Sequence, residues 1–205
     1  MTATSAPKWR RLEPDERREQ IFACAARLFG ERPYSEVSTS DIAAAAGVAR
    51  ALINHYFGTK RELYLAVIRR AVTLPAAGPV TVPGQFDGHS RNAFGWFLDM
   101  VAQQGKMWLV ATSDGVGRDA EVEQILMDAE RKAADRVLDA IELPANHPSR
   151  AEFNALIRAF GGMVKAAGRE WLLREELTRD QVQVLLHRLF VTLVHDVFPA
   201  VREAG

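Results

Sequence analysis

Residues 38–60, STSDIAAAAGVARALINHYFGTK, carry the signals of two short helices joined by a tight turn. Ser38 is a favoured N-cap, and Asp41 three residues later completes a capping box ahead of the apolar Ile42. Four alanines then favour a helix and leave room for a close neighbour. Gly47 supplies the residue with positive φ at which many helices end. The stretch therefore predicts a helix-turn-helix pair.

The second helical run, residues 49–55, has two different faces. Ala49, Ile53 and Phe57 recur at four-residue spacing and are expected to face inward together. A short second helix of this kind can enter the major groove of DNA while the first helix braces it. The alternative is an ordinary helical hairpin inside an all-α protein, because the pattern is short. The opposite face consists of Arg50, Ala51, Leu52, Asn54 and His55.

The residues after the second helix favour the DNA-binding interpretation. Thr59 is expected to cap a third helix with Lys60 in its first turn, where the helix dipole disfavours a cation. A DNA phosphate at that helix end would remove the penalty, because backbone N–H groups and the ammonium would both point at it. We predict that His55, Tyr56 and Lys60 hold phosphates and that Arg50 contacts a base edge. The full predicted DNA-binding set is Ser38, Thr39, Ser40, Arg50, Ala51, Leu52, Asn54, His55, Tyr56 and Lys60.

Residues 15–70 resemble the tetracycline-repressor-like (TetR-type) transcription regulators. The resemblance rests on IFACAARLFGERPYSEVSTSDIAAAAGVARALINHYFGTKRELYLAVI: an apolar first helix ending in LF, the helix-turn-helix, then HYF, a two-residue turn and a lysine. Two positions depart from the family pattern, Pro33 where a glycine is usual and Ala49 where a serine often caps the second helix. The missing cap costs about 1 kcal/mol. The resemblance implies a homodimer, built by packing the last two helices against their copies, and a small-molecule effector.

Composition limits the class of protein. The chain has 205 residues, 48% of them hydrophobic, which suffices for one or two cores. We expect a cytoplasmic protein without a membrane segment, because no apolar run approaches the roughly 20 residues that span a bilayer and the first residues lack a signal peptide's apolar stretch. The single cysteine, Cys24, cannot form an internal disulfide and is expected to be a small core residue.

The formal net charge of zero hides an asymmetry along the chain. Residues 1–70 carry 12 Lys or Arg against 8 Asp or Glu, whereas residues 71–205 carry 14 against 18. A basic end fits an anionic partner, although a solvated basic tail would give the same count. The basic residues near the N-terminus are Lys8, Arg10, Arg11, Arg17 and Arg18.

The whole chain is predicted to be all-α, with three parts. Residues 1–14 are expected to form a disordered basic tail, residues 15–71 a three-helix DNA-binding domain, and residues 72–205 a helical-bundle regulatory and dimerisation domain. Prolines and glycines in residues 72–90 predict a long connection, and Ser90 is expected to cap the next helix. Gly105 is a candidate break in that helix, and Asp119 is expected to cap a long helix that ends near Ile141.

The second domain offers candidates for an effector site and for a dimer interface. Large aromatic and Met side chains line apolar pockets in many proteins, but they are also ordinary core residues, and both interpretations stand. The same holds for Asp114 and Arg118, as polar anchors or loop residues. The candidate effector-binding residues are Trp96, Met100, Trp108 and Trp171.

The last two helices carry more apolar surface than one neighbour needs. Gly161, Gly162 and Gly168 would allow a close approach of a second helix pair, as in a four-helix bundle. Surplus monomer core is the alternative. The predicted interface residues are Val164, Leu186, Phe190 and Leu193.

The sequence offers little to support an enzyme. His187 and His195 differ by about 80° in direction on one helix, which is poor for joint metal ligation, and they are expected in an interface or at the surface. No cysteine cluster and no Ser, His and acid triad suggest themselves. We predict no catalytic residue, metal or cofactor. The predicted function is a ligand-responsive repressor that binds a palindromic DNA operator as a homodimer; the alternative is a helical ligand-binding or dimerisation protein without DNA binding.

Overall fold

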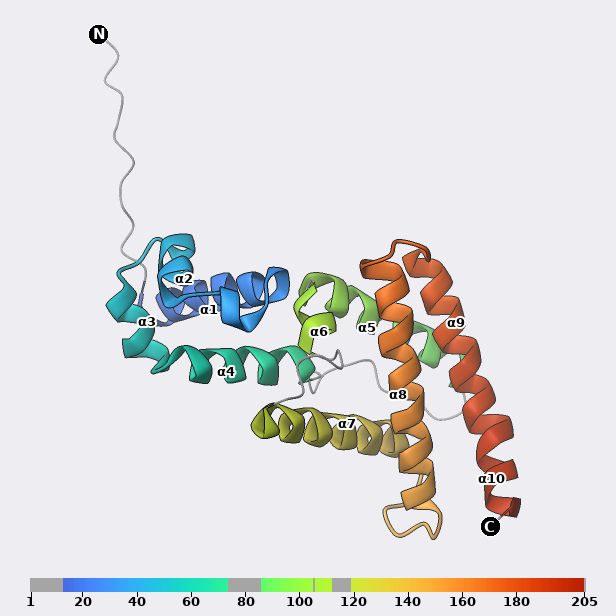
Figure 1. Cartoon of the computed structure of the whole chain (residues 1–205). Coiled ribbons are helices and arrows are strands. Elements are labelled where there is room, and N and C mark those ends of the chain that lie inside the picture. The colour runs from blue at the N-terminus through green and yellow to red at the C-terminus, as the bar shows by residue number, and fades with distance from the viewer. Residues whose placement is uncertain (1–12, 74–85, 105, 112–118, 205) are drawn as a thin grey trace. The chain divides into compact units, whose positions relative to one another are not determined.

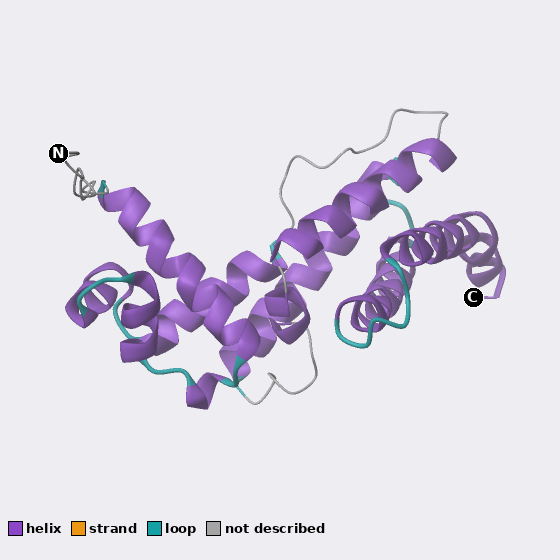
Figure 2. Cartoon of the chain, turned by 90° about the horizontal axis from the view of Figure 1, so that it is seen from above, coloured by secondary structure: helices purple, strands orange, loops and turns teal. Residues whose placement is uncertain are grey.

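The computed structural model describes residues 13–73, 86–104, 106–111 and 119–204, and every regular element in these ranges is a helix (Figures 1 and 2). The predicted all-α fold is confirmed. The chain divides into two compact units, Met1–Val67 and Ile68–Gly205. Most of the predicted tail and of the predicted connection lies outside the described ranges.

The first unit holds the predicted helix-turn-helix. Pro14 occupies the first turn of its first helix, and Glu13 and Glu16 form the capping box there. A short 3₁₀ helix after Pro33 is the one element of this unit that the sequence did not predict. The elements are α1 (Pro14–Glu31), η1 (Tyr34–Glu36), α2 (Thr39–Ala46), α3 (Arg50–Phe57) and α4 (Lys60–Val72).

Side chains from all four helices bury the core of this unit. Cys24 lies at the contact between α1 and α2, where its partly buried thiol is 3.4 Å from the carbonyl oxygen of Ala45. Ala49 is exposed, so the expectation that it faces inward with Ile53 was wrong; as the N-cap of α3 it precedes the helical turn that Ile53 anchors. Fully buried side chains include Ile21, Phe29, Ile42, Ile53 and Leu63.

Local sequence signals fix the ends of α2 and α4. The Ser38 side chain accepts from the Asp41 N–H and the Asp41 carboxylate accepts from the Ser38 N–H, as the capping box predicted. Gly47 ends α2 with φ of 61°, also as predicted. Thr59 caps α4 and pairs with Glu62 in the same reciprocal way.

The second unit contains the remaining helices. Its first helix begins at Phe86, four residues before the predicted cap, and stops at Gln104 next to Gly105, which lies outside the described residues. Asp119 caps the long helix as predicted, since its side chain accepts from the Glu121 N–H at 3.0 Å. The elements are α5 (Phe86–Gln104), α6 (Lys106–Ala111), α7 (Ala120–Ala140), α8 (Arg150–Leu172), α9 (Arg179–Thr192), the π-helix η2 (Leu193–Val197) and α10 (Phe198–Ala204).

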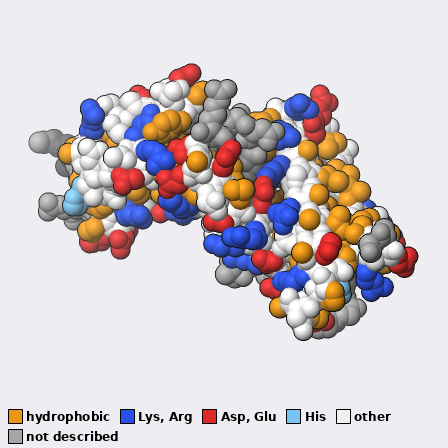
Figure 3. Space-filling view, turned by 60° about the horizontal axis from the view of Figure 1, so that its bottom comes forward, with side chains coloured by type: hydrophobic (Ala, Val, Ile, Leu, Met, Phe, Trp, Pro, Cys, Tyr) orange, Lys and Arg blue, Asp and Glu red, His pale blue; other side chains and the backbone are white. Residues whose placement is uncertain are grey.

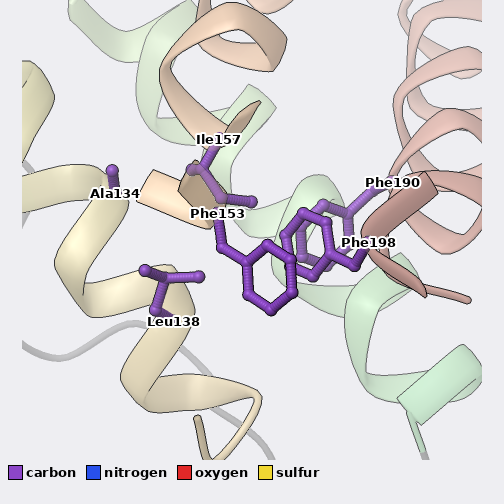
Figure 4. Packing of buried hydrophobic residues seen from close by; sticks show 6 residues of the cluster. All are labelled: Ala134, Leu138, Phe153, Ile157, Phe190 and Phe198. Atoms are coloured by element: carbon purple, nitrogen blue, oxygen red, sulfur yellow. The ribbon is translucent and has the colours of Figure 1, made fainter. Parts of the chain in front are cut away.

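Aromatic packing joins α7, α8 and the C-terminal helices. Phe153 of α8 stacks on Phe198 of α10, with ring centroids 4.2 Å apart. Figure 4 shows these rings beside Phe190, with Leu138 of α7 on the other side of Phe153. The cluster joins the end of α7 and the start of α8 to the C-terminal helices through side chains far apart in the sequence.

Helix α5 approaches α9 closely at Gly95. A Cβ at Gly95 would lie 3.1 Å from Nε2 of Gln183, so only a glycine leaves this amide in place. Arg179 at the start of α9 donates to the Gly95 carbonyl at 2.9 Å and pairs with Asp99 at 2.6 Å. These contacts set α9 in register against α5.

The C-terminal helical run corrects two expectations. His187 is 5% exposed and therefore buried, whereas His195 is exposed. Arg179–Glu203 is also long and apolar enough, by length and composition, to cross a membrane, with 28% of the relevant window buried, whereas no such run was expected. Core helices of soluble proteins pass the same test, so this is weak evidence for a membrane.

Two glycines of the first unit predict different costs of substitution. Gly58 has φ of 73°, and an added Cβ would collide with the Glu62 carboxylate, which cannot move without breaking the α4 capping box. Gly47 has φ of 61° with open space around an added Cβ. Gly47→Ala should destabilise by about 1–2 kcal/mol and Gly58→Ala by clearly more, measured by urea unfolding. Equal losses would show that Glu62 does not require the glycine.

Candidate nucleic-acid interface

Helix α3 has an exposed polar face and one buried side chain, Ile53, on the opposite side. Ile53 is fully buried in the core, and the aromatic ring of Phe57 packs on Phe22 with centroids 6.3 Å apart. The guanidinium of Arg18 lies over the Phe57 ring at 4.9 Å, which holds α1 against the end of α3. The exposed residues of α3 are Arg50, Ala51, Asn54 and His55, while Leu52 and Tyr56 are partly buried.

The start of α3 has no side-chain cap, as Ala49 predicted. The structure instead closes the first turn by a backbone bond from the Leu52 N–H to the Ala49 carbonyl at 2.9 Å. Arg50 and Asn54 are one helical turn apart and lie on the same exposed side. Both side chains have the hydrogen-bonding groups that distinguish base edges in the major groove.

The start of α2 places hydroxyl groups at the surface. Ser38 and Ser40 are exposed and Thr39 is partly buried. The Ser38 hydroxyl donates to the Asp41 carboxylate at 2.8 Å and accepts from the Asp41 N–H at 3.0 Å, so it holds the helix end. The hydroxyl of Ser40 therefore has the more open position for a phosphate contact.

Two exposed carboxylates have lowered pKa values because they cap helices. Hydrogen bonds from the Ser38 N–H, and then its hydroxyl, lower the pKa of Asp41, and the same bonds from Thr59 lower the pKa of Glu62. A lowered pKa stabilises the folded state above the unfolded-state pKa, and this contribution is lost as the pH falls through the folded-state pKa. At neutral pH, therefore, the caps at the starts of α2 and α4 are intact.

Lys60 does not occupy the position that the sequence predicted. Its ammonium donates to the carbonyl oxygens of Tyr34 and Val37, each at 2.7 Å, and lies 3.9 Å from the centroid of the Tyr34 ring. The predicted phosphate ligand is thus turned toward the chain's own backbone.

Both parts of the chain match known families. A family model described as bacterial regulatory proteins, tetR family, matches residues 21–67, and a second, described as tetracyclin repressor-like, C-terminal domain, matches residues 87–193. The second match alone covers more than half of the chain. This chain belongs to the tetR family. Members of the family are transcriptional regulators and not enzymes, and they bind DNA operators and small-molecule effectors, usually as dimers.

Curated relatives match a short part of this tetR-family chain. The HTH-type transcriptional activator FasR of Mycolicibacterium smegmatis is 42% identical over 62 residues, 30% of this chain and 28% of that protein. The HTH-type transcriptional regulator BetI of Rhizobium meliloti is 43% identical over 58 residues, 28% of each chain. The chain therefore matches less than a third of the length of these relatives.

Solved structures of the family share the fold over nearly the whole chain. A tetR-family transcriptional regulator from Streptomyces coelicolor has a TM-score of 0.68 at 24% identity, covering 93% of this chain and 87% of that chain. The fatty acid degradation regulator FadR from Bacillus halodurans has a TM-score of 0.64 at 14% identity, covering 91% and 98%. At such identities the likeness concerns the fold alone.

Three of the four predicted effector-binding residues come together in this regulator. Trp108 of α6 is buried with Val101 and Leu109, and Met100 and Trp171 pack against that cluster. Trp96 is partly buried on α5 and is not among the described residues of this cluster. Asp114 and Arg118, proposed as polar anchors, lie outside the described residues.

The structure corrects the predicted dimer interface. Leu186 has 0% and Phe190 8% exposure within a single chain, so their side chains fill its own core and offer almost no surface to a second copy. Val164 and Leu193 are only partly buried but also pack against internal clusters. Gly168 serves α6, because an added Cβ would lie 2.9 Å from Cζ3 of Trp108.

Other residues on α8 and α9 expose the apolar surface instead. Met163 is 41% exposed, Val184 55% and Leu185 38%. Gly161 and Gly162 have open space where a Cβ would lie. Figure 3 shows hydrophobic side chains gathered toward the right of the view, where the C-terminal helices lie.

Sequence reasoning missed two residues that position the site. Glu62 could have been found, because Thr59 followed three residues later by a glutamate is the capping-box pattern. Tyr34 gave no local signal, since its contacts with Lys60, Phe29 and Tyr64 join distant parts of the chain.

Proposed function

We propose that this tetR-family protein is a ligand-responsive repressor, located in the cytoplasm, that binds a palindromic operator as a homodimer. The observation that supports it best is the exposed face of α3, where Arg50, Asn54 and His55 project from a helix anchored by the buried Ile53. In a symmetric dimer two such helices would enter successive major grooves of an operator with matching symmetry.

The proposed contacts divide into two kinds. Arg50 and Asn54 contact base edges, with Ala51 and Leu52 beside them. His55 and Tyr56, and the α2 start at residues 38–40, contact phosphates. Phosphate contacts fix the register of the protein on the duplex, and base contacts select the sequence. Lys60 is not among the proposed phosphate contacts, because its ammonium donates to the carbonyls of Tyr34 and Val37.

Arg50→Ala tests the base contact. The DNA is a duplex selected by the unmodified protein from a random library, compared with a random-sequence duplex. Arg50→Ala should cost about 1–3 kcal/mol on the selected duplex and relax the preference at one base pair, with a smaller loss on random DNA. Affinity is measured by fluorescence anisotropy.

Arg27→Ala is the matched control for that experiment. Arg27 is an exposed arginine of α1, 55% exposed and paired with Glu31, so its loss removes the same charge from the same unit. Its effect should be small and equal on both duplexes. Equal losses for Arg50→Ala on selected and random DNA would contradict the base contact. Failure of the unmodified protein to select any duplex would favour the alternative, a helical ligand-binding or dimerisation protein.

The proposed dimer forms through the exposed apolar face of α8 and α9. This face is defined by Met163, Val184 and Leu185, with Gly161 and Gly162 permitting close approach. Burying it against a copy would remove apolar surface from water, which is the main favourable term in such associations. The high apolar content and low burial of Arg179–Glu203 agree with this assignment.

Val184→Glu tests the dimer without disturbing the monomer core, because Val184 is 55% exposed in a single chain. A carboxylate buried without a partner in the seam should shift the protein toward monomer at micromolar concentration, measured by analytical ultracentrifugation. Met127→Glu is the control, since Met127 is 56% exposed but lies on α7. A monomeric unmodified protein, or identical masses for the two variants, would rule out this face.

The proposed effector is a small apolar or amphipathic molecule that binds beside Trp108 and releases the DNA. Met100 of α5 and Trp171 of α8 pack against the cluster that contains Trp108, and the Phe97 ring packs edge-on against the Trp108 ring with centroids 5.8 Å apart. Apolar side chains of this kind line many ligand sites. The contact with Gly168 leaves no space on that side of Trp108, so a ligand must approach from another side or displace the indole.

A tryptophan-fluorescence screen of the purified protein tests the effector site. Hits should quench the emission of the unmodified protein and of Trp96→Phe, and less that of Trp108→Phe, because Trp108 lies in the cluster and Trp96 does not, whereas Trp171, which packs against the cluster, remains in all three proteins. Each hit should then lower DNA affinity by about 5–150-fold, and DNA should weaken the hit by the same factor. Hits that bind at Trp108 and leave DNA affinity unchanged would show that the cluster is ordinary core.

A further inference from the structure

Two of the three N–H groups of the Lys60 ammonium have backbone acceptors inside the chain, and the ammonium also lies over an aromatic ring. A lysine ammonium has three N–H groups and no acceptor. Two donate to the carbonyls of Tyr34 and Val37 at 2.7 Å, and the nitrogen lies 3.9 Å from the centroid of the Tyr34 ring, within range of a cation–π contact. A phosphate at this position would therefore meet an ammonium of which two N–H groups are already used by the backbone.

The segment that Lys60 holds leads directly into α2. At the start of the segment the Glu36 N–H donates to the Pro33 carbonyl at 2.9 Å and forms the turn of η1. After it, the Ile42 N–H donates to the Ser38 carbonyl in the first hydrogen bond of α2. The carbonyls of Tyr34 and Val37 lie between these bonds and accept from the ammonium instead. Val37 itself is 1% exposed, so its backbone sits at the edge of the core.

Aromatic rings fix the other side of the same segment. The Tyr34 ring stacks on Phe29 of α1 with centroids 6.0 Å apart and contacts Tyr64 of α4 at 4.7 Å. Tyr34 is 37% exposed, and its ring lies against the Lys60 ammonium while its contacts with Phe29 and Tyr64 hold it in place. Lys60 and Tyr34 together connect three helices.

We propose that Lys60 is a positioning residue, whose ammonium fixes residues 34–37 and thereby the start of α2 against the start of α4. This inference rests on the proposed function in one respect, that the start of α2 contacts the DNA backbone. A cation at a helix N-terminus is unfavourable, and the sequence suggested that a phosphate offsets this cost. In the structure, carbonyl dipoles of the chain itself offset it. In this role Lys60 acts on DNA binding through the position of α2.

Lys60→Met keeps the aliphatic length and removes the donors. The free protein should lose about 3–8 °C in Tm, since charge-assisted hydrogen bonds to two carbonyls are lost. Backbone amide exchange should become faster at residues 38–41. At 10 °C, where the variant is fully folded, affinity for the selected duplex should fall about tenfold, because only a fraction of molecules would hold α2 in its binding position.

The salt dependence separates positioning from phosphate binding. A lost phosphate contact lowers the slope of log K against log salt by about one unit for each subunit. Loss of a positioning residue should leave the slope as it is in Arg61→Met, which removes an equal charge at the neighbouring position. Val67→Ala, a core substitution in α4 at a side chain 1% exposed, supplies the structural control: it should lower Tm and leave the affinity of the folded protein unchanged.

Each outcome bears on the proposal. A lower Tm, faster exchange at residues 38–41 and weaker binding, with the slope of Arg61→Met, support positioning. A slope lower by about one unit with an unchanged Tm would overturn it in favour of a phosphate contact. An affinity loss no larger than that of Val67→Ala would overturn it in favour of a purely structural role. If the unmodified protein binds no DNA, the proposed function fails, and unchanged Tm and amide exchange in Lys60→Met would still overturn the positioning role.

Discussion

A helix of eight residues cannot hold its own shape in water, and α3, the second helix of the helix-turn-helix, has only eight. Isolated helices below about 12–15 residues are marginal because forming the first turn fixes several residues for one hydrogen bond. Helix α3 also lacks a side-chain cap at Ala49 and has one fully buried side chain, Ile53. Its position is therefore set by neighbours: Phe57 packs on Phe22 and under the Arg18 guanidinium, and the α4 cap begins directly after Gly58. Packing against α1, α2 and α4 therefore determines how the exposed face of α3 is oriented.

The features that sequence analysis predicted correctly are those governed by residues close together in the chain. Caps and turns such as Ser38 with Asp41, Gly47 and Asp119 depend on neighbours within three or four residues, so their residue types suffice. Lys60 is a case in which neighbouring residues do not suffice for a prediction. Its acceptors on Tyr34 and Val37 are 26 and 23 residues away, and a local electrostatic argument could supply only the need for an anion or dipole. The carbonyls of Tyr34 and Val37 supply these dipoles, and sequence spacing alone does not indicate that they lie near Lys60.

The prediction that Leu186 and Phe190 lie in the dimer interface was wrong for a different reason. Residues 184–186 are three consecutive apolar residues on one helix, and each points about 100° away from the last. Val184 and Leu185 are exposed, while Leu186 is fully buried against Leu98 and Val182. A helix that is apolar on several sides gives no internal sign of which side its own core takes. Only the placement of α5, fixed by Arg179 and the close contact at Gly95, assigns the inner face and leaves Val184 and Leu185 exposed.

Helix α4 carries two very different attachments at its ends. At the first residue, Lys60 makes two short hydrogen bonds and a ring contact, whereas Arg69 in the last turns pairs with Glu121 of α7 through side chains 53% and 42% exposed. An exposed ion pair of this kind contributes about 0–1 kcal/mol and weakens with salt. Coupling between an effector and DNA requires about 1–3 kcal/mol, so the Arg69 pair alone cannot carry it. The buried Ile68 and Ala71 are the side chains of this helix end whose packing could supply the remainder, at 0% and 7% exposure. If the proposed effector acts on DNA binding through α4, it must shift the apolar contacts of Ile68 and Ala71 at the last turns of the helix. The helix would then transmit this shift to its first turn, which Lys60 holds in place.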